Sequence, residues 1–301
     1  MIAYDHRNHG ESGSSDNGAR IASLAADLHE LLEQLGIEQA NLLGNSMGCS
    51  VLWSYVDLYG TDRVSSLVLV DQPSVCALVP WLTQADAAQV GAIMDFAGAS
   101  SFVQGLLGES SDAVRRDFLR SMLKPDISAE DFDWLLGQNM TMRMPFGARL
   151  VLDHVLQDWR SVLPRIDVPA LVTGGEQSHV DATSQRWIAE QIPGAKLHVF
   201  SPTEGGDHFP FLGPQGLRRC THRVSRLDRL RRARRSAGGV GVATGLLDHA
   251  MGDQPEVQVE SCVAVVDVES GDFANPVEPV VEGGSGGCAS SRRWRPPPQR
   301  R

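Results

Sequence analysis

The 301-residue sequence has few lysines, few aromatic residues and no long apolar run. Lysine occurs only at Lys124 and Lys196, so almost all of the 27 basic residues are arginines. No segment approaches the roughly 18 consecutive apolar residues of a membrane-spanning helix. The first residues, Met1–Asp5, also show no basic stretch followed by an apolar one, which argues against a secretory signal. We therefore expect a cytoplasmic protein without membrane contacts.

Cysteine is scarce as well, with five residues at irregular spacing and no Cys-x-x-Cys pair. This pattern is a poor disulfide framework and a poor zinc site, so we expect reduced thiols and no bound metal. The formal net charge of −10 argues against nucleic acid as a partner of the whole chain. Hydrophobic residues make up 42% of the sequence, which is enough for a sizeable globular core.

Hydrophobic patterning divides the chain into segments of different character. Strand-like runs alternate with helical spacing over residues 1–73, and the same alternation returns over residues 164–212. Strands are predicted at residues 2–4, 41–43, 64–70, 169–173 and 196–200, and helices at residues 21–35, 49–58 and 181–191. Strands and helices that alternate through short links predict an α/β fold with a parallel sheet flanked by helices.

The intervening residues 74–163 lose the strand-like runs and show helical spacing at 85–96, 112–123 and 129–136. We expect them to form a helical cap inserted into the core. Methionine and aromatic residues gather in this segment, either as ordinary core or as the lining of an adaptable apolar pocket, because methionine fills irregular spaces. They are Met94, Met122, Met140, Met142, Met144, Phe96, Phe102, Phe132, Trp134 and Phe146.

Residues 213–301 differ in composition from the rest of the chain. Nine arginines fall within residues 218–235 without a sustained apolar face, and runs rich in Gly, Arg and Pro follow. A basic block of this kind can bind nucleic acid. However, too little apolar area is available to offset the chain entropy, so we expect a disordered tail. The abrupt change near Gly213 suggests a shifted reading frame as its origin.

The sequence Gly44-Asn45-Ser46-Met47-Gly48 places a serine between a predicted strand and a predicted helix. A serine at such a sharp turn needs a glycine two residues away on each side, because side chains there would collide. The N-terminus of the following helix directs backbone N–H groups at developing negative charge. We therefore expect Ser46 to be a nucleophile and the Met47 N–H to be an oxyanion donor. The alternative is a plain serine in an ordinary turn.

Two further motifs stand in order around this serine. Asp5–Ser12 reads as D-x-R-x-x-G-x-S about 35 residues before the serine turn, and Gly206-Asp207-His208 follows the last predicted strand. The three motifs together resemble the α/β-hydrolase superfamily over roughly residues 1–212. The resemblance implies that His208 is the general base for Ser46 and that no cofactor is needed. Members similar to this chain include esterases, C–C hydrolases and the cofactor-free perhydrolases often labelled non-haem haloperoxidases.

The acid that would orient the histidine is left open. The family usually places an aspartate at the position held here by Ser178, which cannot carry a negative charge. Some members instead place the acid after the strand that follows the serine helix, where this chain has Asp71. We favour Asp71, followed by Asp181. Glu176 and the absence of any acid are the remaining alternatives.

The resemblance also implies missing parts. Family members carry about three strands before the D-x-R turn; the third lies beside the serine strand, and the turn after it supplies a second oxyanion donor. We therefore expect an incomplete sheet with an open edge beside residues 41–43.

The predicted function is a serine hydrolase that acts on a small apolar ester or acyl substrate through an acyl-enzyme. The alternative is an inactive fragment that binds ligand without turnover. A small molecule is the expected partner, and the sequence leaves its identity and the oligomeric state open.

Overall fold

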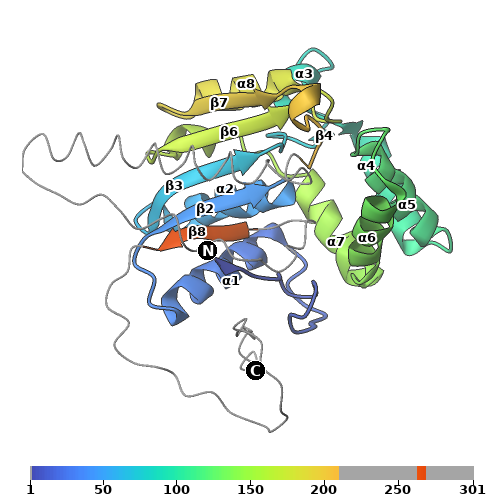
Figure 1. The fold of residues 1–301 in the computed structure, drawn as a ribbon, viewed down its shortest axis with the longest axis horizontal. Helices are drawn as coiled ribbons and strands as arrows, with labels where there is room; N and C mark the ends of the chain where they lie inside the picture. The colour runs from blue at the N-terminus through green and yellow to red at the C-terminus, as the bar shows by residue number, and fades with distance from the viewer. Residues whose placement is uncertain (1, 210–262, 269–301) are drawn as a thin grey trace, which may run out of the picture.

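The computed structural model describes residues 2–209 and 263–268. Its centre is a six-stranded sheet with the strand order β1-β8-β2-β3-β6-β7 (Figure 1). Strands β2, β3, β6 and β7 pair in parallel, whereas β8 pairs antiparallel with β1 and β2. The strands are β1 Ile2–Ala3, β2 Ala40–Asn45, β3 Val64–Val70, β6 Ala170–Gly175, β7 Lys196–Phe200 and β8 Val263–Val268. Because parallel strands end at the same edge, the residues that follow β2, β3 and β6 meet there.

Three helices cover the sheet, and each begins within two residues of its expected position. They are α1 Ile21–Gln34, α2 Met47–Tyr59 and α8 Ala182–Gln191. One stripe of α1 is buried against α2, with Leu24, Leu28 and Leu32 fully enclosed. Burying one such leucine stabilises the fold by about 1.5–3 kcal/mol. Among the described residues, none of the helices has both the length and the apolar composition that crossing a membrane requires.

Strand β8 lies where an open edge was expected. It pairs with Ile2 and Ala3 of β1 and, on its other side, with Ala40–Gly44 of β2. The expectation of a disordered tail was therefore wrong for residues 263–268, where the run Val-Ala-Val-Val-Asp-Val is rich in β-branched residues that favour strands. The other residues of 210–301, including the arginine-rich block, lie outside the described part of the chain.

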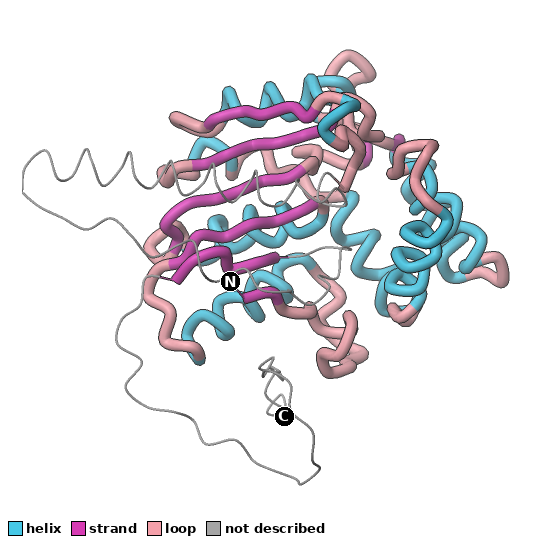
Figure 2. The backbone as a smooth tube through the Cα atoms, in the orientation of Figure 1, coloured by secondary structure: helices cyan, strands magenta, loops and turns pink. Residues whose placement is uncertain are grey.

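The chain between β3 and β6 is mainly helical and gathers at one end of the sheet (Figure 2). Its helices are α3 Ala87–Val90, α4 Phe96–Leu107, α5 Ser111–Ser121, α6 Ala129–Met140 and α7 Met144–Val155. The strand pair β4 Ala77–Leu78 and β5 Met94–Asp95 accompanies them, and the short 3-10 helix η1 Leu163–Arg165 follows. A second 3-10 helix, η2 Pro202–Glu204, comes after β7. The prediction of a helix over residues 85–96 was wrong beyond Val90. Helix α3 ends there because Gly91 adopts a left-handed conformation (φ 81°).

Candidate active site

Ser46 occupies a sharp turn between β2 and α2. Its φ of 51° is unusual for a residue with a side chain, and such strained positions cost of order 1–3 kcal/mol and cluster at functional sites. The Ser46 N–H donates to the carbonyl of Val70 at 2.8 Å, which ties the turn to the neighbouring strand β3. A Cβ atom on Gly44 would lie 2.6 Å from the backbone carbon of Gly48. The turn therefore requires glycine at position 44, as the motif predicted.

Met47 is the first residue of α2, so its N–H has no acceptor within the helix. The partial positive charge of the helix N-terminus lies at the same place. Cys49, two residues further, is fully buried with its Sγ 3.0 Å from the Gly44 carbonyl oxygen, and burial raises the pKa of its thiol. Cys49 is therefore a packing residue beneath the turn.

Asp71 and His208 meet behind this turn. Asp71 directly follows β3, is fully buried, and its Oδ2 lies 2.7 Å from Nδ1 of His208. The backbone of His208 is fixed on two sides: its N–H donates to the Met122 carbonyl at 3.2 Å, and its carbonyl accepts from Asn45 Nδ2 at 3.4 Å. The backbone of His208 is thus held by the residue that precedes Ser46 and by the chain following α5, while its imidazole is held by Asp71.

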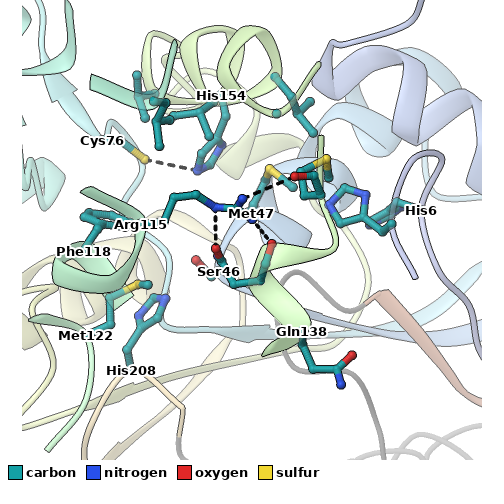
Figure 3. A pocket seen from close by; sticks show the side chains of 18 of the residues that line it. His6, Ser46, Met47, Cys76, Arg115, Phe118, Met122, Gln138, His154 and His208 are labelled. Carbon is teal, nitrogen blue, oxygen red and sulfur yellow. Dashed lines mark hydrogen bonds between the residues drawn. The ribbon is translucent and has the colours of Figure 1, made fainter. Parts of the chain in front are cut away.

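Ser46 and His208 line one pocket, and Figure 3 shows both side chains in it. The second ring nitrogen of His208, Nε2, is buried and has no hydrogen-bond partner among the described residues. The structure therefore brings the hydroxyl and the imidazole to the same pocket without a hydrogen bond between them. Catalytic hydrogen bonds of this type commonly tighten only when substrate is bound.

Ser178 and His179 are additional neighbours of this pair. The Ser178 hydroxyl donates to Asp71 Oδ2, the same oxygen that faces His208. The neutral serine therefore contacts the carboxylate from the very position where the family usually carries its acid. The His179 ring lies 4.5 Å from that of His208, and burial, together with its interaction with the neighbouring His208, lowers the pKa of His179 to about 3. Sequence reasoning did not single out His179, although its position directly after Ser178 was an available signal.

The other candidate acids lie elsewhere. Asp181 caps the N-terminus of α8, where its Oδ1 accepts the Thr183 N–H at 2.7 Å. Glu176 is exposed. Asp207 accepts the backbone N–H groups of Lys124 and Phe209, and burial raises the pKa of its carboxyl group. In the structure, Asp71 is the carboxylate bonded to His208.

The turn at Asp5–Ser12 is organised by its own charged residues. The Asp5 carboxylate accepts the Glu11 N–H at 2.9 Å, and the Asp5 carbonyl accepts the Ser12 hydroxyl. Arg7 forms a two-pronged salt bridge with the buried Asp27 of α1. These contacts give Asp5 and Arg7 a structural role in organising the turn.

The pocket has a volume of about 220 Å³. The sequence left open whether the methionine and aromatic residues of segment 74–163 are ordinary core or pocket lining. Some of them line the pocket and others pack in the core, so each interpretation holds for part of the set. Those at the pocket are Met94, Met122, Met142, Met144 and Phe102. Phe132, Trp134 and Met140 instead pack in a cluster around Leu119 and Leu135 that also includes Phe209.

A buried pair also lies at this pocket, with Cys76 Sγ 3.6 Å from His154 Nε2. Burial raises the pKa of Cys76 to about 12 and lowers that of His154 to about 4, so both side chains are neutral near pH 7. Within residues 2–209 and 263–268, no group of three or more His, Cys, Asp or Glu side chains is placed to hold a metal ion.

Comparison with known proteins shows the family of this chain. A family model for the alpha/beta hydrolase fold matches residues 1–212. The chain belongs to the α/β-hydrolase family. Among curated relatives of this α/β-hydrolase, a non-heme chloroperoxidase of Kitasatospora aureofaciens is 29% identical over 214 residues, which cover 69% of this chain and 74% of the relative. A bifunctional esterase/perhydrolase of Acinetobacter calcoaceticus is 24% identical, over 65% of this chain and 71% of the relative.

Solved structures give the same fold. An esterase from Exiguobacterium antarcticum aligns with a TM-score of 0.64 at 22% identity and covers 74% of this α/β-hydrolase and 80% of the esterase. A bromoperoxidase from Bacillus anthracis aligns with a TM-score of 0.60 at 23% identity, over 68% and 73% of the two chains. Together with the family match, the relatives show that the chain is an enzyme of the α/β-hydrolase type, similar to esterases and haloperoxidases.

Proposed function

We propose that this α/β-hydrolase cleaves a small ester or related acyl compound through an acyl-enzyme on Ser46. In the first step, Ser46 Oγ forms a bond to the acyl carbon while its proton passes to His208 Nε2. The same proton then goes to the departing alkoxide as the C–O bond breaks. Water releases the acyl group by the reverse sequence of proton transfers. The Met47 N–H stabilises the negative charge on the acyl oxygen.

One observation carries the proposal: His208 Nδ1 is 2.7 Å from a buried carboxylate while Nε2 is left at a pocket shared with Ser46. A carboxylate at Nδ1 holds the proton on that nitrogen and leaves Nε2 as the acceptor that a general base needs. It also stabilises the imidazolium formed once Nε2 takes the serine proton. Asp71 therefore fits the acid role, whereas Asp181 is occupied as a helix cap.

The size and lining of the pocket favour a small and largely apolar acyl group. The walls next to Ser46 are built from methionine, phenylalanine and aliphatic side chains, and the volume of about 220 Å³ is modest. Relatives named as an esterase/perhydrolase and as a 3-oxoadipate enol-lactonase support acyl chemistry at such a site.

The proposal is tested by covalent labelling with a fluorophosphonate and by hydrolysis of p-nitrophenyl butyrate. We expect labelling and turnover in the wild-type chain and neither in Ser46→Ala. Labelling that persists in Ser46→Ala would contradict the role of Ser46. Binding of the ester to wild-type protein without labelling or turnover would instead support a non-catalytic binding protein.

A further inference from the structure

The turn that follows β6 holds the carboxylate of Asp71. Asp71 itself has a φ of 53°, a left-handed conformation that is uncommon for a residue with a side chain, and its N–H donates to the Thr173 carbonyl at 2.8 Å. Its Oδ1 lies 3.4 Å from the Gly175 N–H, and its Oδ2 accepts the Ser178 hydroxyl. Both oxygens of the carboxylate are therefore contacted by the turn at residues 175–178.

The Ser178 hydroxyl is a donor of fixed direction. The Val180 N–H donates to Ser178 Oγ at 3.0 Å, so this oxygen already accepts one bond and its single proton is directed at the carboxylate. The Ser178 N–H donates to the Gly175 carbonyl at 3.3 Å, which closes the turn. Ser178 is not among the residues that line the pocket of Ser46. Its side chain therefore contacts Asp71 from outside the space in which a substrate would lie.

The hydroxyl is important because Asp71 is fully buried. A buried carboxylate loses its hydration and depends on hydrogen bonds for compensation. Among the described residues, the salt bridge of Asp71 is with His208, and no arginine or lysine forms one with it. His208 Nδ1 and the Ser178 hydroxyl face the same oxygen, Oδ2, while Oδ1 faces Gly175. These contacts define one rotation of the carboxylate group.

We propose that Ser178 is a positioning residue of the active site: its hydroxyl holds the Asp71 carboxylate in the rotation that places Oδ2 against His208 Nδ1. This inference rests on the proposed acyl hydrolysis at Ser46 and adds a residue that acts behind the base and its acid. The effect is greatest during proton transfer, because His208 then becomes positively charged and the carboxylate must lie at a fixed distance from it. Ser178 therefore acts through Asp71 and not on the substrate.

A purely structural role for Ser178 makes a different prediction. If the serine only fixed its own turn, its removal would displace the neighbouring His179, which lines the pocket. Substrate binding would then change, and KM with it. A positioning role instead lowers kcat and kcat/KM by the same factor and leaves KM unchanged, because the contact matters only in the transition state.

The kinetic experiment measures hydrolysis of p-nitrophenyl butyrate by Ser178→Ala. We expect kcat to fall about 10–100-fold, the range for a lost hydrogen bond to a charged group, with KM within about twofold of the wild type. Ser178→Thr retains the hydroxyl and should recover most of this loss. Ser184→Ala is the matched control: Ser184 is also a hydrogen-bonded serine, with its Oγ 2.7 Å from the Asp181 carbonyl, but it does not contact Asp71. Equal losses of kcat in Ser178→Ala and Ser178→Thr would overturn the inference.

Ser178→Cys covers the case in which Ser178→Ala does not fold. The thiol is close to the hydroxyl in size but is a much weaker donor. We expect a lower kcat with an unchanged KM in this variant as well. A kcat equal to that of the wild type would count against the inference.

Proton NMR of the protein without substrate separates this inference from the proposed function. The Nδ1–H of His208, bonded to a carboxylate, should give a signal at low field that is absent in His208→Gln. We expect this signal to shift or broaden in Ser178→Ala and to stay unchanged in Ser184→Ala. Such a change, in a chain whose wild type hydrolyses no ester, would support the positioning of Asp71 and refute the hydrolysis. A signal that is unchanged in Ser178→Ala would overturn the inference even if the wild type hydrolyses esters at Ser46.

Discussion

Replacing Asp71 with asparagine is the most direct test of how the site works. The side chains have the same shape, but the amide offers one acceptor atom where the carboxylate offers two. In the structure, Oδ2 of Asp71 accepts from both His208 Nδ1 and the Ser178 hydroxyl, while Oδ1 is 3.4 Å from the Gly175 N–H. An asparagine cannot serve all three donors.

Each orientation of the amide has a defined penalty. With its oxygen toward His208, the NH₂ group faces the Gly175 N–H, so two donors meet in a buried place. With its nitrogen toward His208, Nδ1 must become an acceptor, the ring proton moves to Nε2, and the base is lost. In both orientations the imidazolium loses its counter-charge. A substitution of this kind in a serine triad lowers kcat by about 10⁴-fold, or about 5 kcal/mol.

The assay is steady-state hydrolysis of p-nitrophenyl butyrate by Asp71→Asn, with Asp181→Asn as the matched control. Asp181 accepts the Thr183 N–H as the cap of α8, and asparagine caps a helix equally well. We therefore expect Asp181→Asn to stay within about threefold of the wild-type rate. Activity of Asp71→Asn within tenfold of the wild type, in a chain with unchanged circular dichroism, would refute the assigned role of the carboxylate.

Three further predictions concern stability. In the unfolded chain His154 binds a proton below about pH 6.5, whereas in the folded protein the buried side chain binds it only near pH 4. The free energy of unfolding therefore falls by up to about 3 kcal/mol as the pH decreases across this window. In urea titrations His154→Gln should lose less stability than the wild type between pH 7 and pH 4, and equal losses would contradict this. Gly44→Ala should unfold at least 2 kcal/mol more easily, because its Cβ would meet Gly48 backbone at 2.6 Å, and an unchanged melting temperature would be the contrary result. Arg7→Met should lose about 3–5 kcal/mol in urea, because Asp27 would remain as an unpaired buried charge, while Arg7→Met combined with Asp27→Leu should recover part of that loss.

The parallel core of the fold could be predicted from the sequence, because its signals are local. The β-branched run Val64–Val70 is a strand with those bounds, and the strand at Lys196–Phe200 also begins and ends as expected. Glycine spacing around Ser46 indicated the serine turn, since the steric requirement acts over only four residues. Short-range patterns of this kind survive in the folded chain when tertiary contacts do not oppose them.

Features that depend on distant contacts could not be predicted in the same way. The sequence favoured Asp71 over Asp181 as the partner of His208 but left the choice open, because the contact depends on the order of the strands in the sheet. Arg115 of α5 lines the pocket but was not singled out from the sequence, although it lies one turn before the buried Leu119. Strand β8 was overlooked because the surrounding composition suggested disorder, and its pairing partners lie more than 200 residues away in sequence.

The position of β8 between β1 and β2 has a consequence for the order in which the protein is made. The first strands to leave the ribosome are those flanking β8, yet their shared neighbour is translated only when residues 263–268 emerge. Until then, the strand leading directly into Ser46 has one side without its final hydrogen-bond partner, and closing so long a loop is slow. A nascent chain halted before residue 263 therefore presents the reactive turn on an unfinished scaffold, which is the form most exposed to chaperones and to pairing with other strands.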